Sequence, residues 1–137
     1  MRWFLAVILV ALIIPAAYYL NEAQKEPPKA PVVLQVTPSV VKPTDTIIIR
    51  VINNANVNAT AGYEFTLYRY ENGNWTKVNT GLMFIQTLRT IPPGKSWQQT
   101  VGLSELKLKP GKYRVEKVVF VNGTRYMVSG EFEVVES

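Results

Sequence analysis

Hydrophobic and polar residues alternate in short stretches along most of the chain after residue 31. The stretches lie at 32–37, 46–53, 62–70, 74–78, 81–90, 96–103, 113–121 and 124–135. A period of two is the pattern of a strand with one buried face, and turn residues about 8–12 positions apart are typical of an antiparallel sandwich. The pattern therefore predicts an all-β domain at 32–137 with about seven or eight strands.

The same alternation predicts the faces that form the core. The strand at 124–135 places Tyr126, Val128, Phe132 and Val134 on one side. The inward faces of 96–103 and 113–121 are also apolar, but each holds one polar exception, Gln99 and Lys117 respectively. Stripes of this kind can pack as one core between two sheets.

Residues 3–20 form an apolar stretch of eighteen residues without a charge, and Arg2 precedes it. Eighteen helical residues span roughly 27 Å, close to the ~30 Å hydrocarbon thickness of a bilayer. Trp3, Tyr18 and Tyr19 lie at the two ends, where aromatic rings favour the membrane interface. We expect residues 1–20 to be a single-pass anchor in the cell membrane, with the C-terminal domain extracytoplasmic.

A cleaved secretory signal is the alternative for residues 1–20, and it would make the domain secreted. Ala16, Ala17 and Ala23 are small enough for a cleavage site, yet none completes a clean A-x-A motif. Residues 21–31 are polar and carry three prolines, which favour extended geometry. A short stalk is therefore predicted before the domain.

Charge and composition exclude several classes of function. The formal net charge is +5, and no run of basic residues occurs, so no nucleic-acid partner is expected. The chain has no Cys, no His and a single aspartate, Asp45. Disulfides, thiol nucleophiles and a Ser-His-Asp triad are therefore excluded. We expect no enzyme activity, no cofactor and no metal site.

Several motifs occur in a recognisable order. They are TIIIRVIN at 46–53, GYEFTLYRYENGNWTKV at 62–78, a Pro-Pro-Gly turn at 92–94, LKPGKYRV at 108–115 and EFEV at 131–134. In this order they resemble a bacterial immunoglobulin-like domain of cell-envelope proteins, over residues 32–135. The resemblance implies an immunoglobulin-like β-sandwich, with Tyr113 as a tyrosine corner whose hydroxyl bonds nearby backbone. It also implies a non-catalytic role in binding, adhesion or the structure of an envelope assembly.

A second likeness supports an alternative function. The segment MFIQTLRTIPPGKSWQQTVGL at 83–103, followed by PGKYRV, resembles the back half of a small proteinase-inhibitor sandwich known from bacilli. An extracytoplasmic proteinase inhibitor is therefore the competing prediction.

The stretch YRYENGNWTKV at 68–78 contains the clearest candidate site. Asn72-Gly73 is a strong signal for a type I′ hairpin turn, because both central residues need positive φ. A two-residue turn places Tyr68, Tyr70, Trp75 and Lys77 together on the outward face. Such a patch can stack on sugar rings or anchor a protein partner. Alternatively, the rings only pair across the strands to stabilise the hairpin.

Three Asn-x-Thr triplets occur in predicted loops or hairpin tips, at Asn58, Asn74 and Asn122. An exported chain can carry glycan at such positions in a host with the required enzymes. We therefore expect these asparagines to be possible glycosylation sites.

Overall fold

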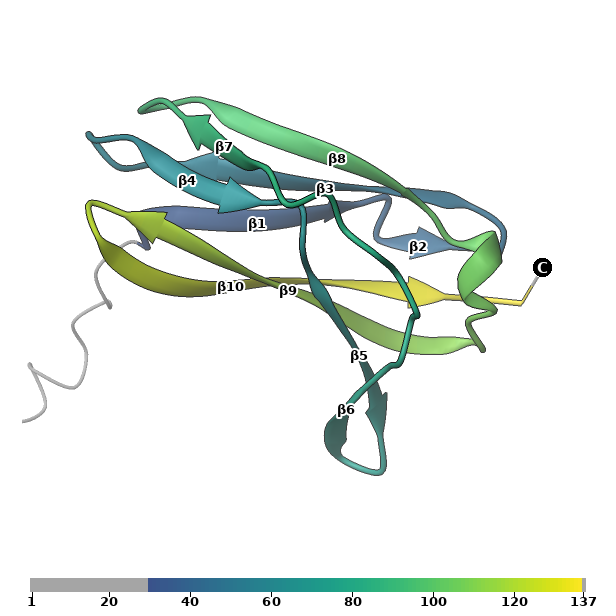
Figure 1. Ribbon diagram of the computed structural model, residues 1–137. Coiled ribbons are helices and arrows are strands. Elements are labelled where there is room, and N and C mark those ends of the chain that lie inside the picture. The colour runs from purple at the N-terminus through teal and green to yellow at the C-terminus, as the bar shows by residue number, and fades with distance from the viewer. Residues whose placement is uncertain (1–29, 137) are drawn as a thin grey trace, which may run out of the picture.

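Two β-sheets lie face to face in the computed structural model, which describes residues 30–136 (Figure 1). The first sheet has the order β1 (Val32–Thr37), β3 (Thr46–Asn53) and β8 (Ser96–Gly102). The second has the order β2 (Val40–Val41), β10 (Thr124–Val134), β9 (Gly111–Val121), β4 (Ala59–Gly62) and β7 (Leu88–Ile91). In addition, β5 (Thr66–Glu71) pairs with β9, and β6 (Asn74–Lys77) pairs with β5. The predicted all-β sandwich is confirmed.

Residues 30–136 contain a single short helical turn. One 3-10 turn, η1 (Ser104–Leu106), connects β8 to β9. Within this range no helix reaches the length and apolarity needed to cross a bilayer. The predicted anchor or signal at 1–20 and nearly all of the predicted stalk lie outside the described residues, so both stay predictions.

The structure has more strands than the seven or eight predicted, because one predicted continuous segment is divided and one two-residue strand was not predicted. The chain leaves the first sheet after Thr37, passes Pro38 and joins the second sheet as β2, parallel to β10. The prediction contained no strand at Val40–Val41. A two-residue strand is too short to produce a detectable alternation.

The predicted strand at 62–70 is broken by a bulge. Both β4 and β5 pair with β9, with Ala61 opposite Val119 and Thr66 opposite Glu116. Residues 62–65 therefore lie opposite only Lys117 and Val118, which leaves two extra residues on the bulged side. Such an excess bends a strand and frees backbone groups from the ladder.

The predicted strand at 81–90 is wrong for most of its length, since only Leu88–Ile91 is strand. The ladder from β5 ends where the Val78 amide donates to the Leu67 carbonyl at 2.8 Å. Beyond Val78 the bulge at 62–65 offers no regular strand for pairing. Residues 79–87 therefore run from β6 to β7 as an irregular segment, which we call the strap. Phe84 turns inward onto Phe65, with ring centroids 5.1 Å apart, while Met83 lies almost fully exposed.

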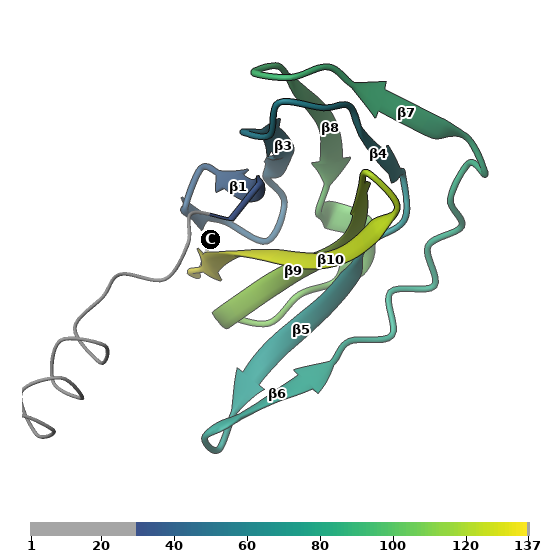
Figure 2. The ribbon, with the colours of Figure 1, turned by 90° about the vertical axis from the view of Figure 1, so that its left-hand side faces the viewer.

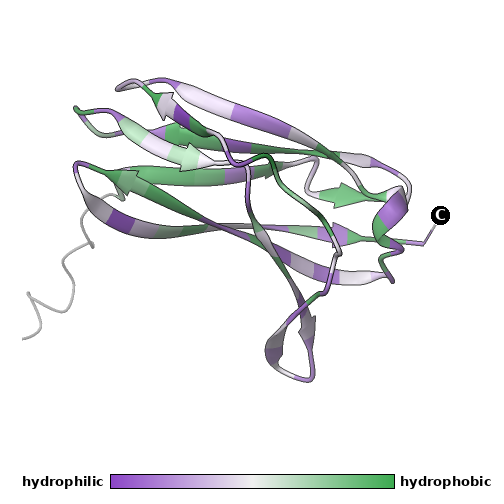
Figure 3. Cartoon of the chain, viewed as in Figure 1, coloured by the Kyte–Doolittle hydropathy of each residue, from purple (hydrophilic) through white to green (hydrophobic). Residues whose placement is uncertain are grey.

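The core lies between the sheets, on the faces that the alternation predicted. Figure 3 shows the alternation as hydrophobic and hydrophilic bands along the strands. The largest fully buried apolar side chains are Tyr113, Ile47, Ile49, Leu67, Ile91, Leu103, Val32, Val51, Val115, Val119 and Val134. Both polar exceptions also point inward, and Lys117 is only 1% exposed.

Gly130 lies where β10 passes closest to β1, and its missing side chain makes this approach possible. A β-carbon there would be 2.8 Å from Leu34 Cδ2, 3.0 Å from Val36 Cγ2 and 3.2 Å from the Leu34 carbonyl oxygen. Gly130→Ala is expected to lower the free energy of unfolding by about 2 kcal/mol, because β1 must shift.

Gly102→Ala is the matched control for this prediction. Gly102 also lies in a strand, and a β-carbon there would meet no atom within 4 Å. Urea unfolding of both variants measures the difference. Equal unfolding midpoints would contradict the close approach of β1 to Gly130.

Candidate functional site

The β5–β6 hairpin projects from the body of the sandwich (Figure 1). Tyr70 lies opposite Trp75 and Tyr68 opposite Lys77, which confirms the predicted register. Asn72 and Gly73 have φ values of 51° and 83°, as a type I′ turn requires. The turn residues thus hold the aromatic side chains on one face of the ribbon.

Cations from β9 lie beside these rings. Tyr70 and Trp75 meet edge to face, with centroids 5.2 Å apart. The Arg114 guanidinium carbon is 4.1 Å from the Trp75 centroid, and the Lys112 Nζ is 5.8 Å from the Tyr70 centroid. We call Tyr68, Tyr70, Trp75, Lys112 and Arg114 the aromatic–cation face. Contacts at these distances are favourable because the ring faces carry negative charge density.

Tyr68 completes this face through the neighbouring strand. Its hydroxyl donates a hydrogen bond of 3.3 Å to Glu116 Oε1 on β9. Burial raises the pKa of Tyr68, and the Glu116 carboxylate raises it further, so the phenol stays protonated at neutral pH. On β10, Glu131 lies 3.8 Å from the cationic groups of both Lys112 and Arg114. The face therefore carries charges of both signs around its rings.

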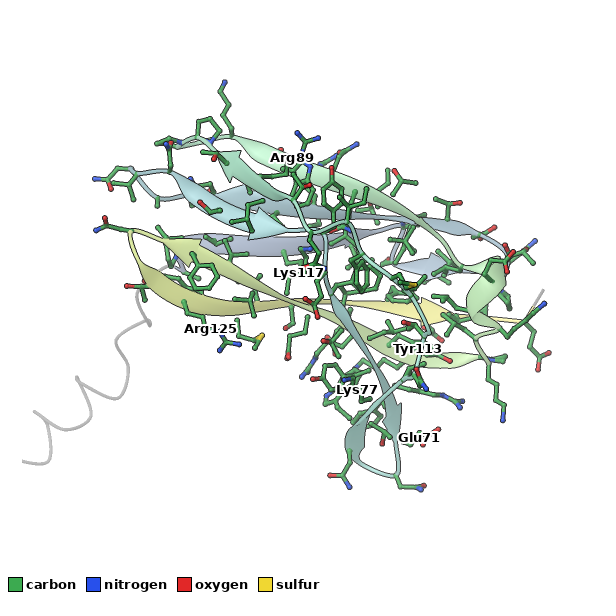
Figure 4. All side chains as sticks on the ribbon, viewed as in Figure 1. Glu71, Lys77, Arg89, Tyr113, Lys117 and Arg125 are labelled. Carbon is green, nitrogen blue, oxygen red and sulfur yellow. The ribbon has the colours of Figure 1, made fainter. Side chains whose placement is uncertain are left out.

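The sequence pattern pointed to Lys77 as the cation of this face and did not point to Arg114 or Lys112. Lys77 is exposed on the projecting hairpin (Figure 4), while the closest cation to a ring comes from β9. The alternation of 113–121 indicated that Arg114 points outward. It did not indicate that β9 pairs with β5, because neighbours across a sheet are not encoded locally.

A buried polar network fills the bulge between β4 and β5. The Lys117 Nζ donates to the Gly62 and Glu64 carbonyls at 2.8 and 2.9 Å and to Gln99 Oε1 at 2.8 Å. Gln99 Nε2 in turn donates to the Tyr63 carbonyl at 3.0 Å. The two polar exceptions on the inward faces thus satisfy three consecutive carbonyls that the bulge removes from the ladder.

Burial lowers the pKa of Lys117 to about 8, and the nearby Glu64 carboxylate opposes part of this effect. All three protons of its ammonium have an acceptor, which is the full donor capacity of a lysine. The side chain is enclosed and its donors are used, so the network supports the bulge rather than an exposed reactive group.

Tyr113 bonds backbone just upstream of its own strand position. Its hydroxyl donates to the Lys109 carbonyl at 2.6 Å, across the Pro110-Gly111 turn. The ring stacks on Phe132 with centroids 5.5 Å apart. Burial raises the pKa of Tyr113, and Arg69 opposes this shift. This is the contact that characterises a tyrosine corner.

The three candidate glycosylation sites lie in different parts of the fold, and only Asn74 belongs to the β5–β6 hairpin. Asn58 precedes β4, Asn74 begins β6 and Asn122 lies in the turn between β9 and β10. All three are exposed. Their accessibility is compatible with modification, which stays a prediction.

An open groove of about 650 Å³ runs beside the hairpin, between the bulge, the strap and the outer face of β9 and β10. Its apolar lining includes Phe65, Ile85, Leu88, Phe120 and Met127. Across residues 30–136, no three Asp or Glu side chains lie close enough together to hold a metal ion.

Two packed β-sheets with a tyrosine-corner contact are typical of immunoglobulin-like domains. The bacterial Ig-like domain family matches residues 28–133, and the chain belongs to this family. A search of curated proteins found no match.

Several solved structures are similar to this chain at low sequence identity. The structural genomics target SoR45 is 19% identical with a TM-score of 0.50, over 77% of this chain and 86% of that one. The archaellum periplasmic stator complex FlaF–FlaG of Sulfolobus acidocaldarius is 17% identical with a TM-score of 0.48, over 80% of this chain and 94% of that one. The Pseudomonas fluorescens alkylpurine DNA glycosylase AlkC is 21% identical with a TM-score of 0.46, over 78% of this chain. The chain spans only 31% of the glycosylase chain.

Proposed function

We propose that this protein is a membrane-anchored, extracytoplasmic Ig-like module that binds a partner at the cell surface without catalysis. Its family supports a module of this kind, and the uncharged apolar segment at 3–20 supports the anchor. The observation that carries a binding role is the aromatic–cation face on a projecting hairpin. Tyr70 is 45% exposed there, although large aromatic side chains are usually more buried.

The geometry of this face favours a flat partner surface with polar groups, such as a sugar ring or a protein loop. Tyr and Trp supply rigid contact area, and cations beside them can meet acceptor groups of the partner. The proteinase-inhibitor alternative has no comparable support, because the family that matches the chain is described as a bacterial Ig-like domain.

Trp75→Ala is expected to weaken binding to a purified cell-envelope fraction at least about tenfold, as loss of an aromatic anchor does at other interfaces. The measurement is equilibrium binding of the full chain, held in nanodiscs by its anchor, to that fraction after its lipid has been extracted with detergent, together with the thermal unfolding of the chain. Removal of Trp75 also removes the ring beneath Arg114, so a small loss of stability is expected.

Thr76→Ala is the matched control, since Thr76 is exposed on the opposite face of the same strand. It should leave binding unchanged. Equal binding by Trp75→Ala and Thr76→Ala would show that the rings only stabilise the hairpin, and would reject this binding role.

A further inference from the structure

Charge is distributed unevenly along the length of the sandwich. We call residues 30–35, 50–62, 88–98 and 118–127 the proximal half, because β1 begins there. Strand register places these segments together within each sheet, since Arg50 lies opposite both Gln35 and Gln98 in the first sheet and Val118 lies opposite Met127 in the second. The two sheets meet at this end, where Asn53 of β3 donates a hydrogen bond to the Ile91 carbonyl of β7. The remaining described residues form the distal half, which is the larger of the two, with 67 residues against 40.

The proximal half holds four basic residues and no acidic residue. The four are Arg50, Arg89, Lys95 and Arg125. The distal half holds eight basic and eight acidic residues. All the net positive charge of residues 30–136 therefore lies in the half from which the chain leads back to residue 29. Figure 2 looks onto this end of the molecule, and Figure 4 labels Arg89 and Arg125.

The proximal half also exposes large apolar side chains. Leu88 is 70% exposed, Met127 50% and Phe120 44%. Phe120 lies opposite Arg125, so a ring and a cation are neighbours on the outer surface. Exposed apolar groups flanked by cations are the combination that binds the boundary between headgroups and acyl chains.

The length of the stalk brings this half close to any bilayer that holds residues 3–20. Residues 21–31 can extend at most about 40 Å, at about 3.5 Å for each residue. Attraction between exposed charges extends only about 8 Å at physiological ionic strength, so the cations act once the surface is near. A partner that does not lie in the bilayer has no such restriction, and can approach the distal half, where basic and acidic residues balance, as easily as the proximal half.

We propose that the proximal half docks on anionic lipid headgroups of the bilayer that anchors the chain. The docking rests on the proposed membrane anchor. Arg89, Lys95 and Arg125 contact the phosphates, and Phe120 and Met127 enter the headgroup layer. The distal half and the aromatic–cation face then point away from the bilayer or along it, toward partners.

The test uses the full chain in nanodiscs of phosphatidylcholine alone or mixed with phosphatidylglycerol. The chain has no native Cys, so Thr124→Cys in the proximal half accepts a single donor fluorophore. Acceptor-labelled lipid reports how close this end lies to the bilayer. Energy transfer should be higher in the anionic discs and should fall at high salt.

Two triple variants separate local from overall charge. Arg89→Gln/Lys95→Gln/Arg125→Gln should reduce the docked-to-undocked ratio by roughly fivefold for each cation, on the order of 100-fold in all. The control Lys42→Gln/Lys107→Gln/Lys109→Gln removes the same charge from exposed distal positions and should retain docking. Equal effects of the two variants would overturn the proposal.

The remaining outcomes distinguish the docking from the anchor. Retention in the bilayer after an alkaline wash, with energy transfer independent of lipid charge, would overturn the docking alone. Loss of the chain in that wash would overturn both. Binding of dextran sulfate that needs the three proximal cations, without any lipid effect, would assign this half to a polysaccharide and overturn lipid docking.

Discussion

Asn53→Asp is expected to lower the free energy of unfolding by about 4 kcal/mol, a large part of the stability of a domain this size. Asn53 is fully buried at the end of β3. Its Nδ2 donates to the Val57 and Ile91 carbonyls, both at 2.9 Å, and its Oδ1 accepts from the Ala55 amide. An aspartate oxygen would face the two carbonyls with negative charge and no proton to donate.

Asn54→Asp is the control for this prediction, because it makes the same chemical change one residue later at an exposed position. Its effect should stay within about 0.5 kcal/mol. Urea unfolding at neutral pH measures both variants. A neutral carboxyl can donate one hydrogen bond, so the defect of Asn53→Asp should become smaller at pH near 4. Coincident unfolding curves for the two variants at neutral pH would refute the role assigned to Asn53.

Lys117 is expected to make stability rise with pH between about 8 and about 10.5. Burial lowers its pKa to about 8 in the folded protein, against 10.5 for an ordinary lysine. Between these values the unfolded chain holds a proton that the folded protein has released, so higher pH favours folding. Below pH 8 both states hold the proton, and the contribution is constant. The gain is at most about 3 kcal/mol.

Other groups titrate in the same range, so the measurement is the difference between the wild type and Lys117→Met. The unfolding free energy of the wild type should increase relative to that of Lys117→Met as pH rises from 8 to 10.5. The control is Lys112→Met on the same strand, since Lys112 is exposed. A constant difference for Lys117→Met over this range would mean that the ammonium is not enclosed as described.

Local chemistry was enough to predict the parts of the fold that depend on neighbours in sequence. The Asn72-Gly73 turn, the hairpin register around it and the inward faces of β9 and β10 all follow from turn preference and the period of two. The resemblance added the identity of the fold and the position of Tyr113. Neither source located the residues that lie beside the Trp75 ring.

The sequence alone therefore determined that most of residues 32–135 fold as short strands, that Lys117 and Gln99 break the apolar pattern, and that 3–20 is apolar throughout. Tertiary structure decided that the two exceptions meet at a bulge, that β9 lies beside β5, and that Arg50, Arg89, Lys95 and Arg125 lie toward one end of the sandwich. The reason is that alternation specifies which side of a strand is buried, whereas strand neighbours are chosen by contacts between residues far apart in the chain.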